Sequence, residues 1–214
     1  MLLNVLIKMN PSSDQTNIAE ETFNRDGYVI VDDFLFTDVV NELHQLAIDH
    51  EQVDDLYRDY HSINFDNQKF PFEILPDVIN AIHVTFPMLH PLEFDRGWAF
   101  VCDNKGNGVT PHADPAVVNV NLWVTPDRCI DDPTSNGLLI YDKKRPDDWT
   151  YDQYNSDVDG INKFLKTSEA KPRLVPYQFN RMILFDSRYF HKTNGVSMKE
   201  GKENRRVNYT FMFK

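Results

Sequence analysis

The chain has 214 residues, which is enough for a domain with a full hydrophobic core. Apolar residues make up 41% of it and aromatic residues 13%, as in folded globular proteins rather than disordered chains. The formal net charge of −11 argues against nucleic acid and anionic membrane surfaces as partners, because basic surfaces bind both.

The two cysteines and the N-terminus bear on the compartment. Cys102 and Cys129 show neither a CxxC spacing nor a disulfide framework, which favours a reducing compartment. Residues 1–14 are expected to be a loose leader, since the apolar run 1–7 is too short and lacks the basic start of a signal peptide. No run reaches transmembrane length. We therefore expect a cytoplasmic protein in which residues 15–214 form a single domain.

The first half of this domain, residues 15–95, is predicted to be a helical support. Apolar residues recur at helical spacing over 16–26, and Gly27 is typical of a helix end. A short strand is predicted over 28–31, followed by a second helix capped by Thr37. The apolar stripe of that helix contains Val39, Val40, Leu43, Leu46 and Ala47. Residues 51–95 hold four prolines, and we expect them to pack helices and loops around the outside.

The second half, residues 96–214, has the pattern of a β protein. Short runs rich in strand-forming residues are separated by Gly, Pro, Asn and Asp, at 98–102, 117–124, 137–141, 182–185 and 206–213. This spacing predicts a mostly β fold, a barrel or jelly roll. Residues 142–179 form a polar insertion that is too long for a hairpin loop, and such insertions are usually functional or disordered.

Two of the predicted strands carry polar residues on one face, because successive side chains of a strand point to opposite faces. In the last strand the apolar face has Val207, Tyr209, Phe211 and Phe213, and the other face has Arg206, Asn208, Thr210 and Met212. In 117–124 the apolar set is Val118, Val120, Leu122 and Val124, opposite Asn119, Asn121 and Trp123. The polar face either lines a barrel that binds a ligand or is simply solvated, and both readings stay open.

The stretch "TPHADP" at 110–115 is the first candidate for a metal site. On an extended segment His112 and Asp114 point the same way and can reach one ion, and this pair suits Fe(II), Mn or Zn. One such match is expected by chance in a chain with 7 histidines and 33 acidic residues, so the motif alone favours a polar loop.

Two further residues strengthen the metal reading. His191 is expected just past the end of the strand 182–185, whereas the histidines at 44, 50, 61, 83 and 90 lie in outer segments and are read as surface or packing residues. Arg206, in the next strand, can bind a carboxylate with two parallel hydrogen bonds, and Thr210 shares its face. Arg205 points to the other face, so Arg206 is preferred as the anchor. The alternative is a surface basic pair.

These motifs together resemble those of the Fe(II)/2-oxoglutarate-dependent oxygenases, in the prolyl hydroxylase and phytanoyl-CoA dioxygenase branches. The matching segments are "HAD", "RMILFDSRYFH", "RVNYTF", the N-terminal "FNRDGYVIVDDFLFTDVVNELHQLA" and "TSNGLLIYD", where Asn136 replaces a glycine. The resemblance covers residues 20–214. It implies a double-stranded β-helix, a cupin-like barrel, with supporting N-terminal helices.

The resemblance also implies roles for individual residues. His112, Asp114 and His191 would be the catalytic metal ligands that hold Fe(II), and Arg206 would bind the distal carboxylate of 2-oxoglutarate with help from Thr210 and Asn121. Such an enzyme uses O2, releases succinate and CO2, and oxidises a substrate C–H bond. Asp114, in place of a small residue, favours hydroxylation over halogenation.

The insertion 142–179 is interpreted as a substrate lid. Its aromatic side chains could contact a sugar, a peptide or a planar ligand, or they could pack the insertion onto the barrel; they are Trp149, Tyr151, Tyr154, Phe164 and Tyr177.

Two other classes of protein compete with the oxygenase. A cupin-like module that binds metal or sugar without turnover explains the barrel, but the His-x-His pair and the following Glu of cupin sites are absent. A catalytically inactive barrel that serves as an interaction protein explains the fold but not the intact set of ligands with Arg206. The substrate stays open among a small molecule, a glycan and a peptide, and the oligomeric state is not specified.

Overall fold

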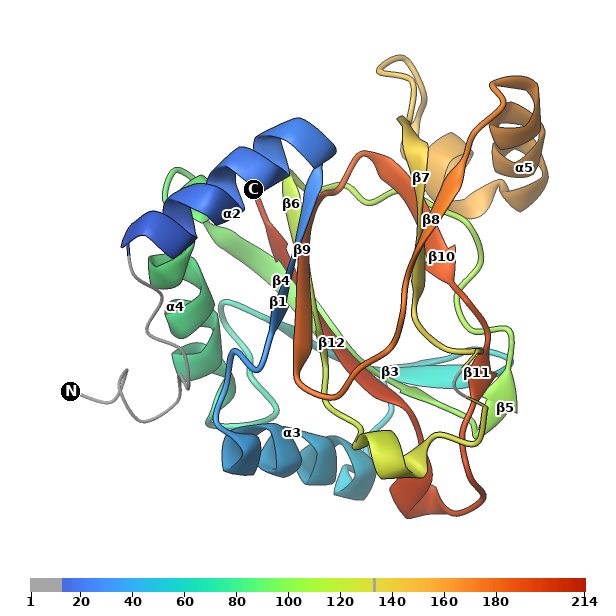
Figure 1. Ribbon diagram of the computed structural model, residues 1–214. Helices are drawn as coiled ribbons and strands as arrows, with labels where there is room; N and C mark the ends of the chain where they lie inside the picture. The colour runs from blue at the N-terminus through green and yellow to red at the C-terminus, as the bar shows by residue number, and fades with distance from the viewer. Residues whose placement is uncertain (1–12, 133) are drawn as a thin grey trace.

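The computed structural model describes residues 13–132 and 134–214, and its frame is a pair of antiparallel β-sheets (Figure 1). The larger sheet has seven strands in the order β1-β9-β6-β12-β4-β3-β2 and the smaller has three in the order β10-β7-β8, with a separate ribbon of β11 and β5. The strands are β1 (Tyr28–Asp32), β2 (Asp55–Leu56), β3 (Tyr60–Asp66), β4 (Phe94–Cys102), β5 (Lys105–Gly106), β6 (Val118–Trp123), β7 (Leu138–Lys144), β8 (Pro172–Val175), β9 (Arg181–Asp186), β10 (Tyr189–Thr193), β11 (Val196–Ser197) and β12 (Val207–Phe213).

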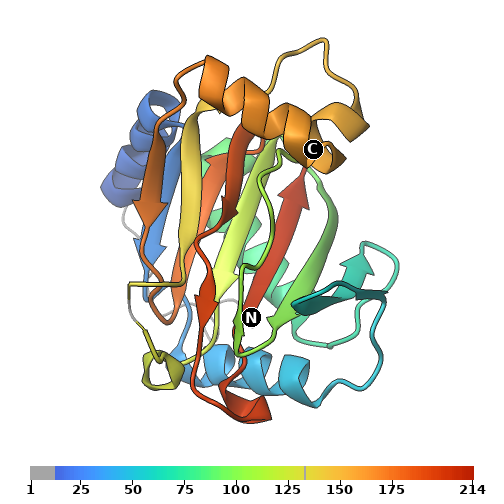
Figure 2. The same ribbon diagram turned by 90° about the vertical axis from the view of Figure 1, so that its right-hand side faces the viewer.

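Helices cover the outer side of this frame. The longer ones are α2 (Ser13–Asp26), α3 (Thr37–Asp49), α4 (Leu75–Thr85) and α5 (Val158–Thr167), and the short ones are η1 (Pro87–Leu89), η2 (Asp127–Cys129), the π-helical turn η3 (Asp152–Ser156) and η4 (Lys202–Asn204). Figure 1 shows α2, α3 and α4 beside the larger sheet, away from the smaller sheet, and Figure 2 shows α5 across one end of the molecule. The fold is the predicted double-stranded β-helix with helical support.

Two hydrophobic cores lie on the two sides of the larger sheet. The outer core packs α3 and α4 against the apolar faces of β6 and β12, so the alternation predicted for these strands is confirmed. The inner core lies between the sheets and consists of Trp123, Leu138, Ile140, Val175, Ile183 and Phe185. The polar residues of the inner face are buried as well, namely Asn119, Asn121, Arg206, Asn208 and Thr210. The reading of a solvated polar face is therefore wrong, and this face lines the interior of the barrel.

Strand β3 is the main element that the sequence prediction missed. Residues 60–66 pair with β4 and extend the larger sheet, although 51–95 was predicted to hold only helices and loops. Only Ser62, Ile63 and Phe65 of this strand are buried, so its sequence lacks a clear apolar alternation. Gly97 of β4 lets the chains approach here, since a Cβ atom there would lie 2.5 Å from the Phe65 ring and from the Thr210 carbonyl oxygen.

Other boundaries differ slightly from the prediction. Helix α2 begins at Ser13, inside the predicted leader, and residues 1–12 lie outside the described residues. Helix α3 has Phe36 at its N-cap position without a side-chain cap, so Thr37 is its first residue rather than its cap. The insertion is shorter than predicted, because 142–144 belong to β7 and 172–175 form β8.

The turn before β7 needs a backbone that few residues adopt. Asn136 and Gly137 both have positive φ, 76° and 105°, a conformation that Asn and Gly tolerate better than other residues. Within the part of the chain that the structure describes, no helix combines the length and apolar character needed to cross a membrane.

Candidate active site

His112 and His191 are brought together by the backbone. The N–H of each donates to the carbonyl oxygen of the other, at 3.0 and 2.8 Å, so the two residues form a short antiparallel bridge. The N–H of Asp114 donates to the carbonyl of Ser187 at 3.0 Å, which ties the same loop to the turn between β9 and β10. His191 follows the end of β9 as predicted, but it lies inside a further strand, β10, because the chain turns at Ser187 and starts this strand at Tyr189.

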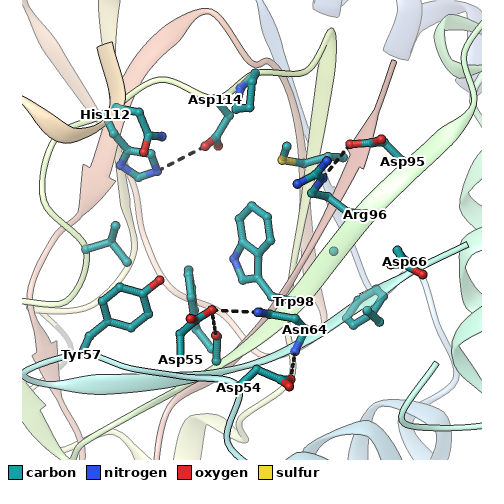
Figure 3. A pocket seen from close by; sticks show the side chains of 18 of the residues that line it. Asp54, Asp55, Tyr57, Asn64, Asp66, Asp95, Arg96, Trp98, His112 and Asp114 are labelled. Atoms are coloured by element: carbon teal, nitrogen blue, oxygen red, sulfur yellow. Dashed lines mark hydrogen bonds and ion pairs between the residues drawn. The ribbon is translucent and has the colours of Figure 1, made fainter. Parts of the chain in front are cut away.

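The three side chains converge on one point. The Nε2 atom of His191 is 3.3 Å from one carboxylate oxygen of Asp114, and the Nε2 atom of His112 is 3.7 Å from the other. All three candidate ligand atoms lie within 4.8 Å of one another, and the described residues contain no second group of this kind. Figure 3 shows the His112 and Asp114 side chains pointing toward each other.

The hydrogen bonds of the imidazoles fix which nitrogen is free. His112 Nδ1 lies 2.8 Å from the carbonyl oxygen of Thr110, and His191 Nδ1 lies 3.0 Å from that of Tyr189. A carbonyl can only accept, so each Nδ1 carries a proton, and in the neutral form of each imidazole the lone pair of Nε2 points to the centre. Burial, together with the neighbouring His191, lowers the pKa of His112, which keeps that imidazole neutral.

Asp114 is buried but ionised. Burial alone would raise its pKa, yet the positive charge of the neighbouring imidazoles in their protonated form and the hydrogen bond from Asn119 outweigh this effect and hold the pKa of Asp114 at about 2. Asn119 Nδ2 donates a hydrogen bond to the carboxylate, and the hydroxyl of Ser187 donates to Asn119 Oδ1 at 3.2 Å. Sequence reasoning placed Asn119 on the polar face but gave it no role. The carboxylate and the two imidazoles form a ligand set that fits a divalent cation.

Arg206 lies in a narrow pocket between the two sheets. Its side chain is buried, with the guanidinium carbon 5.8 Å from the centre of the Trp123 ring and 5.6 Å from that of Tyr177. Two of its nitrogens, Nε and Nη1, are buried without a hydrogen-bond partner. Unpaired buried donors on a cation are costly, so this pocket is suited to an anion. Arg205 instead lies 3.6 Å from Asp103, outside the pocket.

Asn121 and Thr210 share the pocket with Arg206. The Thr210 hydroxyl donates to Asn121 Oδ1 at 2.7 Å, and both side chains are buried. The pocket has a volume of about 40 Å³, and its lining also includes Asn208, which parity placed on the same face without a role. His112, Asp114 and His191 line it too, so the candidate metal ligands and the buried arginine face one space.

A second, larger cavity opens beside the candidate metal ligands His112 and Asp114. We call it the outer chamber; it has a volume of about 1050 Å³. His112 and Asp114 line both spaces, as do Trp98, Phe100 and Val109. The chamber is walled by β3, β4, the β2–β3 hairpin and the insertion between β7 and β8 (Figure 3).

The insertion contacts the loop that carries His112 and Asp114 directly. The N–H of Ala113, between His112 and Asp114, donates to the carbonyl of Tyr154 at 2.8 Å, and Asn155 Nδ2 donates to the carbonyl of Ala113 at 3.0 Å. The turn η3 thus holds both backbone groups of Ala113. Asn155 has no signal in the sequence that could have singled it out.

The aromatic side chains of the predicted insertion have mostly packing contacts. Trp149 and Phe164 pack around Phe190, Tyr154 is buried beside them, and Tyr177 stacks on Trp123 at 4.9 Å. Only Tyr151 among them lines the outer chamber, and it is 51% exposed. The packing interpretation therefore describes the other four.

Comparisons with known proteins found similar solved structures only. No family model matches the sequence, and no curated protein matches it. Among solved structures, the 2-oxoglutarate-dependent epimerase SnoN from nogalamycin biosynthesis has a TM-score of 0.66 at 13% identity, over 95% of this chain and 83% of that one. A prolyl-4-hydroxylase from Pseudomonas putida has a TM-score of 0.56 at 13% identity, over 97% of this chain and 98% of that one.

A third neighbour was solved with ligands. HygX from Streptomyces hygroscopicus, with nickel and 2-oxoglutarate bound, has a TM-score of 0.58 at 11% identity, over 95% of this chain and 87% of that one. At such low identities these likenesses show that the chain has the double-stranded β-helix fold of 2-oxoglutarate oxygenases.

Proposed function

We propose that the protein is an Fe(II)- and 2-oxoglutarate-dependent oxygenase that hydroxylates its substrate. His112, Asp114 and His191 would hold Fe(II), and Arg206 would bind the distal carboxylate of 2-oxoglutarate, with Asn121 and Thr210 beside it. One observation carries the proposal: a buried guanidinium with unpaired donors lines the same narrow pocket as two free Nε2 atoms and an ionised carboxylate. When bound, Fe(II), 2-oxoglutarate and O2 supply the oxidation of a substrate C–H bond, with release of succinate and CO2.

The residues of the narrow pocket have separate tasks in this proposal. Two imidazoles and one carboxylate leave positions open on a metal for a bidentate ligand and for oxygen. The planar fork of Arg206 matches a carboxylate with two parallel hydrogen bonds, and the rings of Trp123 and Tyr177 restrict its movement. The hydroxyl of Tyr177 is fixed by both backbone groups of Thr125, at 2.8 and 2.9 Å, so this wall is rigid.

Hydroxylation is the outcome that Asp114 supports best. Its carboxylate would supply the third protein ligand, and the hydrogen bond from Asn119 holds it in place. The structural neighbours include an epimerase and a carbocyclase as well as prolyl hydroxylases, so the fold alone does not select the reaction.

Conversion of 2-oxoglutarate to succinate in the absence of a second substrate tests the proposal. The wild-type protein, supplied with Fe(II), a reductant, O2 and 2-oxoglutarate, is expected to form succinate slowly, in proportion to the 2-oxoglutarate consumed. His191→Ala should abolish this succinate formation because it removes a metal ligand. His90→Ala is the matched control, since His90 is exposed and contacts only the Val84 carbonyl among the hydrogen bonds that the structure gives it. If the folded, Fe(II)-loaded wild type forms no succinate, the oxygenase proposal is wrong and the protein is a metal-binding barrel without turnover.

A further inference from the structure

The outer chamber has an unusual balance of charge for a space beside a metal site. Five carboxylates face two cationic side chains in its lining: Asp54, Asp55, Asp66, Asp95 and Asp114 against Lys69 and Arg96. Part of this charge is already neutralised. Asp95 pairs with Arg96 at 2.8 Å and with Lys214 at 2.9 Å, and Asp114 belongs to the metal ligands.

The carboxylates of Asp54 and Asp55 have only neutral hydrogen-bond donors as partners. Asp54 accepts a hydrogen bond from the backbone N–H of Asn64 at 2.6 Å, and Asp55 accepts from Asn64 Nδ2 at 2.8 Å and the Ser62 hydroxyl at 3.2 Å. All these donors are neutral. Among the described residues neither carboxylate forms a salt bridge, so the β2–β3 hairpin presents two adjacent negative charges to the chamber.

A row of aromatic rings runs from this hairpin toward the metal ligands. Tyr57 stacks on Tyr60 with ring centres 4.4 Å apart, Tyr60 meets Phe100 at 4.9 Å, and Phe100 meets Trp98 at 5.6 Å. Figure 3 shows Asp55 and Tyr57 across Trp98 from His112 and Asp114. Ring faces attract cations and pack against hydrocarbon, so this wall suits a body that carries a positive charge at one end.

The two spaces beside the metal ligands therefore have opposite electrostatics. The narrow pocket contains the unpaired guanidinium of Arg206 and suits a carboxylate. The outer chamber contains unpaired carboxylates, which repel a second anion and attract a cation. This opposition separates the sites for two different molecules by charge, and it rests on buried Arg206 as well as on the acidic side chains.

We propose that the substrate is an organic cation, with an ammonium or guanidinium group on an aliphatic or ring-containing body. The cation would lie between Asp54, Asp55 and Tyr57, and the body would extend along Tyr60 and Trp98 so that a C–H bond reaches the metal ligands. This inference rests on the proposed function, because it takes His112, Asp114 and His191 as the reacting centre. A chamber of about 1050 Å³ has room for a free amine of drug size or for a Lys or Arg side chain of a peptide.

Matched probes that differ only in the head group test the charge preference. Calorimetric titration of the Fe(II)- and 2-oxoglutarate-loaded protein without O2 compares 2-phenylethylamine, 2-phenylethanol and phenylacetate. The amine should bind at least about tenfold more tightly than the alcohol, as expected for one charge-assisted contact, and phenylacetate should bind most weakly. The amine preference should shrink as NaCl is raised, because the carboxylates are exposed and salt screens them.

Two double variants separate the hairpin from the overall charge. Asp54→Asn with Asp55→Asn keeps the acceptor oxygens for Asn64 and Ser62 but removes both charges, and it should abolish the preference for the amine. Asp147→Asn with Asp148→Asn makes the same change in net charge at an adjacent exposed pair outside the chamber, and it should leave the preference intact. Equal binding of amine and alcohol by the wild type, or an equal loss in both double variants, would overturn the inference.

A peptide arm distinguishes the source of the cation. The blocked tripeptide acetyl-Gly-Lys-Gly-amide and its norleucine analogue are titrated in the same way. Tighter binding of the lysine peptide than of 2-phenylethylamine supports a protein side chain as the substrate, and the reverse order supports a free amine. Repeating the amine series on metal-free protein keeps the two proposals apart, since the charge preference does not need the metal. A wild type that prefers the amine but forms no succinate would refute the oxygenase alone.

Discussion

The narrow pocket and the outer chamber share His112 and Asp114 but are built in different ways. Much of the narrow pocket is formed by side chains of the central strands β4, β6 and β12 and by Arg206 directly before β12, and Arg206, Asn121 and Thr210 are all at most 7% exposed. The outer chamber has one wall on the β2–β3 hairpin at the edge of the sheet, where Tyr57 is 45% exposed. Groups on central strands are held by packing on both sides, whereas an edge hairpin tolerates change.

This difference teaches where cosubstrate binding and substrate selectivity can reside in such a barrel. A cosubstrate that every turnover requires fits a rigid pocket with one buried cation. A substrate fits the more open chamber, whose charge is set by residues that hold little of the core. We therefore expect substitutions in the narrow pocket to have large effects on 2-oxoglutarate and substitutions in the outer chamber to change only the second ligand.

The largest effect is expected when a carboxylate is placed in the narrow pocket, because this removes the difference in charge between the two spaces. Asn121→Asp keeps the oxygen that accepts from Thr210 but adds a negative charge beside the site for the anion. The affinity for 2-oxoglutarate should fall about 100-fold, because a buried like charge opposes the dianion. Titration of the Fe(II)-loaded protein with 2-oxoglutarate measures the change.

The control for this variant adds the same charge to the other space. Asn67 is exposed and lines the outer chamber, so Asn67→Asp should leave the affinity for 2-oxoglutarate nearly unchanged and raise the affinity for 2-phenylethylamine. Equal losses of 2-oxoglutarate affinity in both variants would show that the two spaces are not electrostatically separate.

A smaller effect is expected where the turn η3 contacts the loop that carries His112 and Asp114. Asn155→Ala removes the hydrogen bond to the carbonyl of Ala113. A neutral hydrogen bond contributes about 1 kcal/mol, so the affinity for the metal should fall roughly fivefold. Competition with a metal-sensitive dye measures the affinity for Fe(II) or Mn(II). Gln153→Ala is the matched control, because Gln153 accepts from the N–H of Thr150 within the same turn and does not contact Ala113. The same loss in both variants would point to the turn as a whole rather than to the contact.

The sequence predicted the narrow pocket better than the outer chamber, and the reason is physical. Arg206, Asn121 and Thr210 interrupt strands that are otherwise apolar, and a polar residue in a buried strand is unusual enough to be read from alternation alone. Alternation also placed Asn119 and Asn208 on the polar face, but it shows only the face of the sheet to which a side chain points. Their contacts depend on which strands are neighbours, and that is decided by the long connection through the smaller sheet.

The outer chamber gave no comparable signal. Asp54 and Asp55 precede a strand with weak alternation, and exposed acidic residues in a chain of net charge −11 look like an ordinary solvated surface. Their position across from Asp114 follows only once β3 is paired with β4. Likewise nothing in the sequence indicated that His191 lies in a strand of its own, because the turn at Ser187 and Arg188 between β9 and β10 is too short to recognise.

The most direct test of the account is an anaerobic titration of the Fe(II)-loaded protein with 2-oxoglutarate, followed by the visible charge-transfer band of the chelated complex. The wild type and Arg205→Ala should show the band at similar 2-oxoglutarate concentrations, since Arg205 lies outside the narrow pocket beside Asp103. Arg206→Ala should need about 100-fold more 2-oxoglutarate, as for the loss of one partner of a buried charge pair, and His112→Ala should show no band. A folded wild type that binds Fe(II) without the band, or equal effects of the two arginine variants, would contradict it.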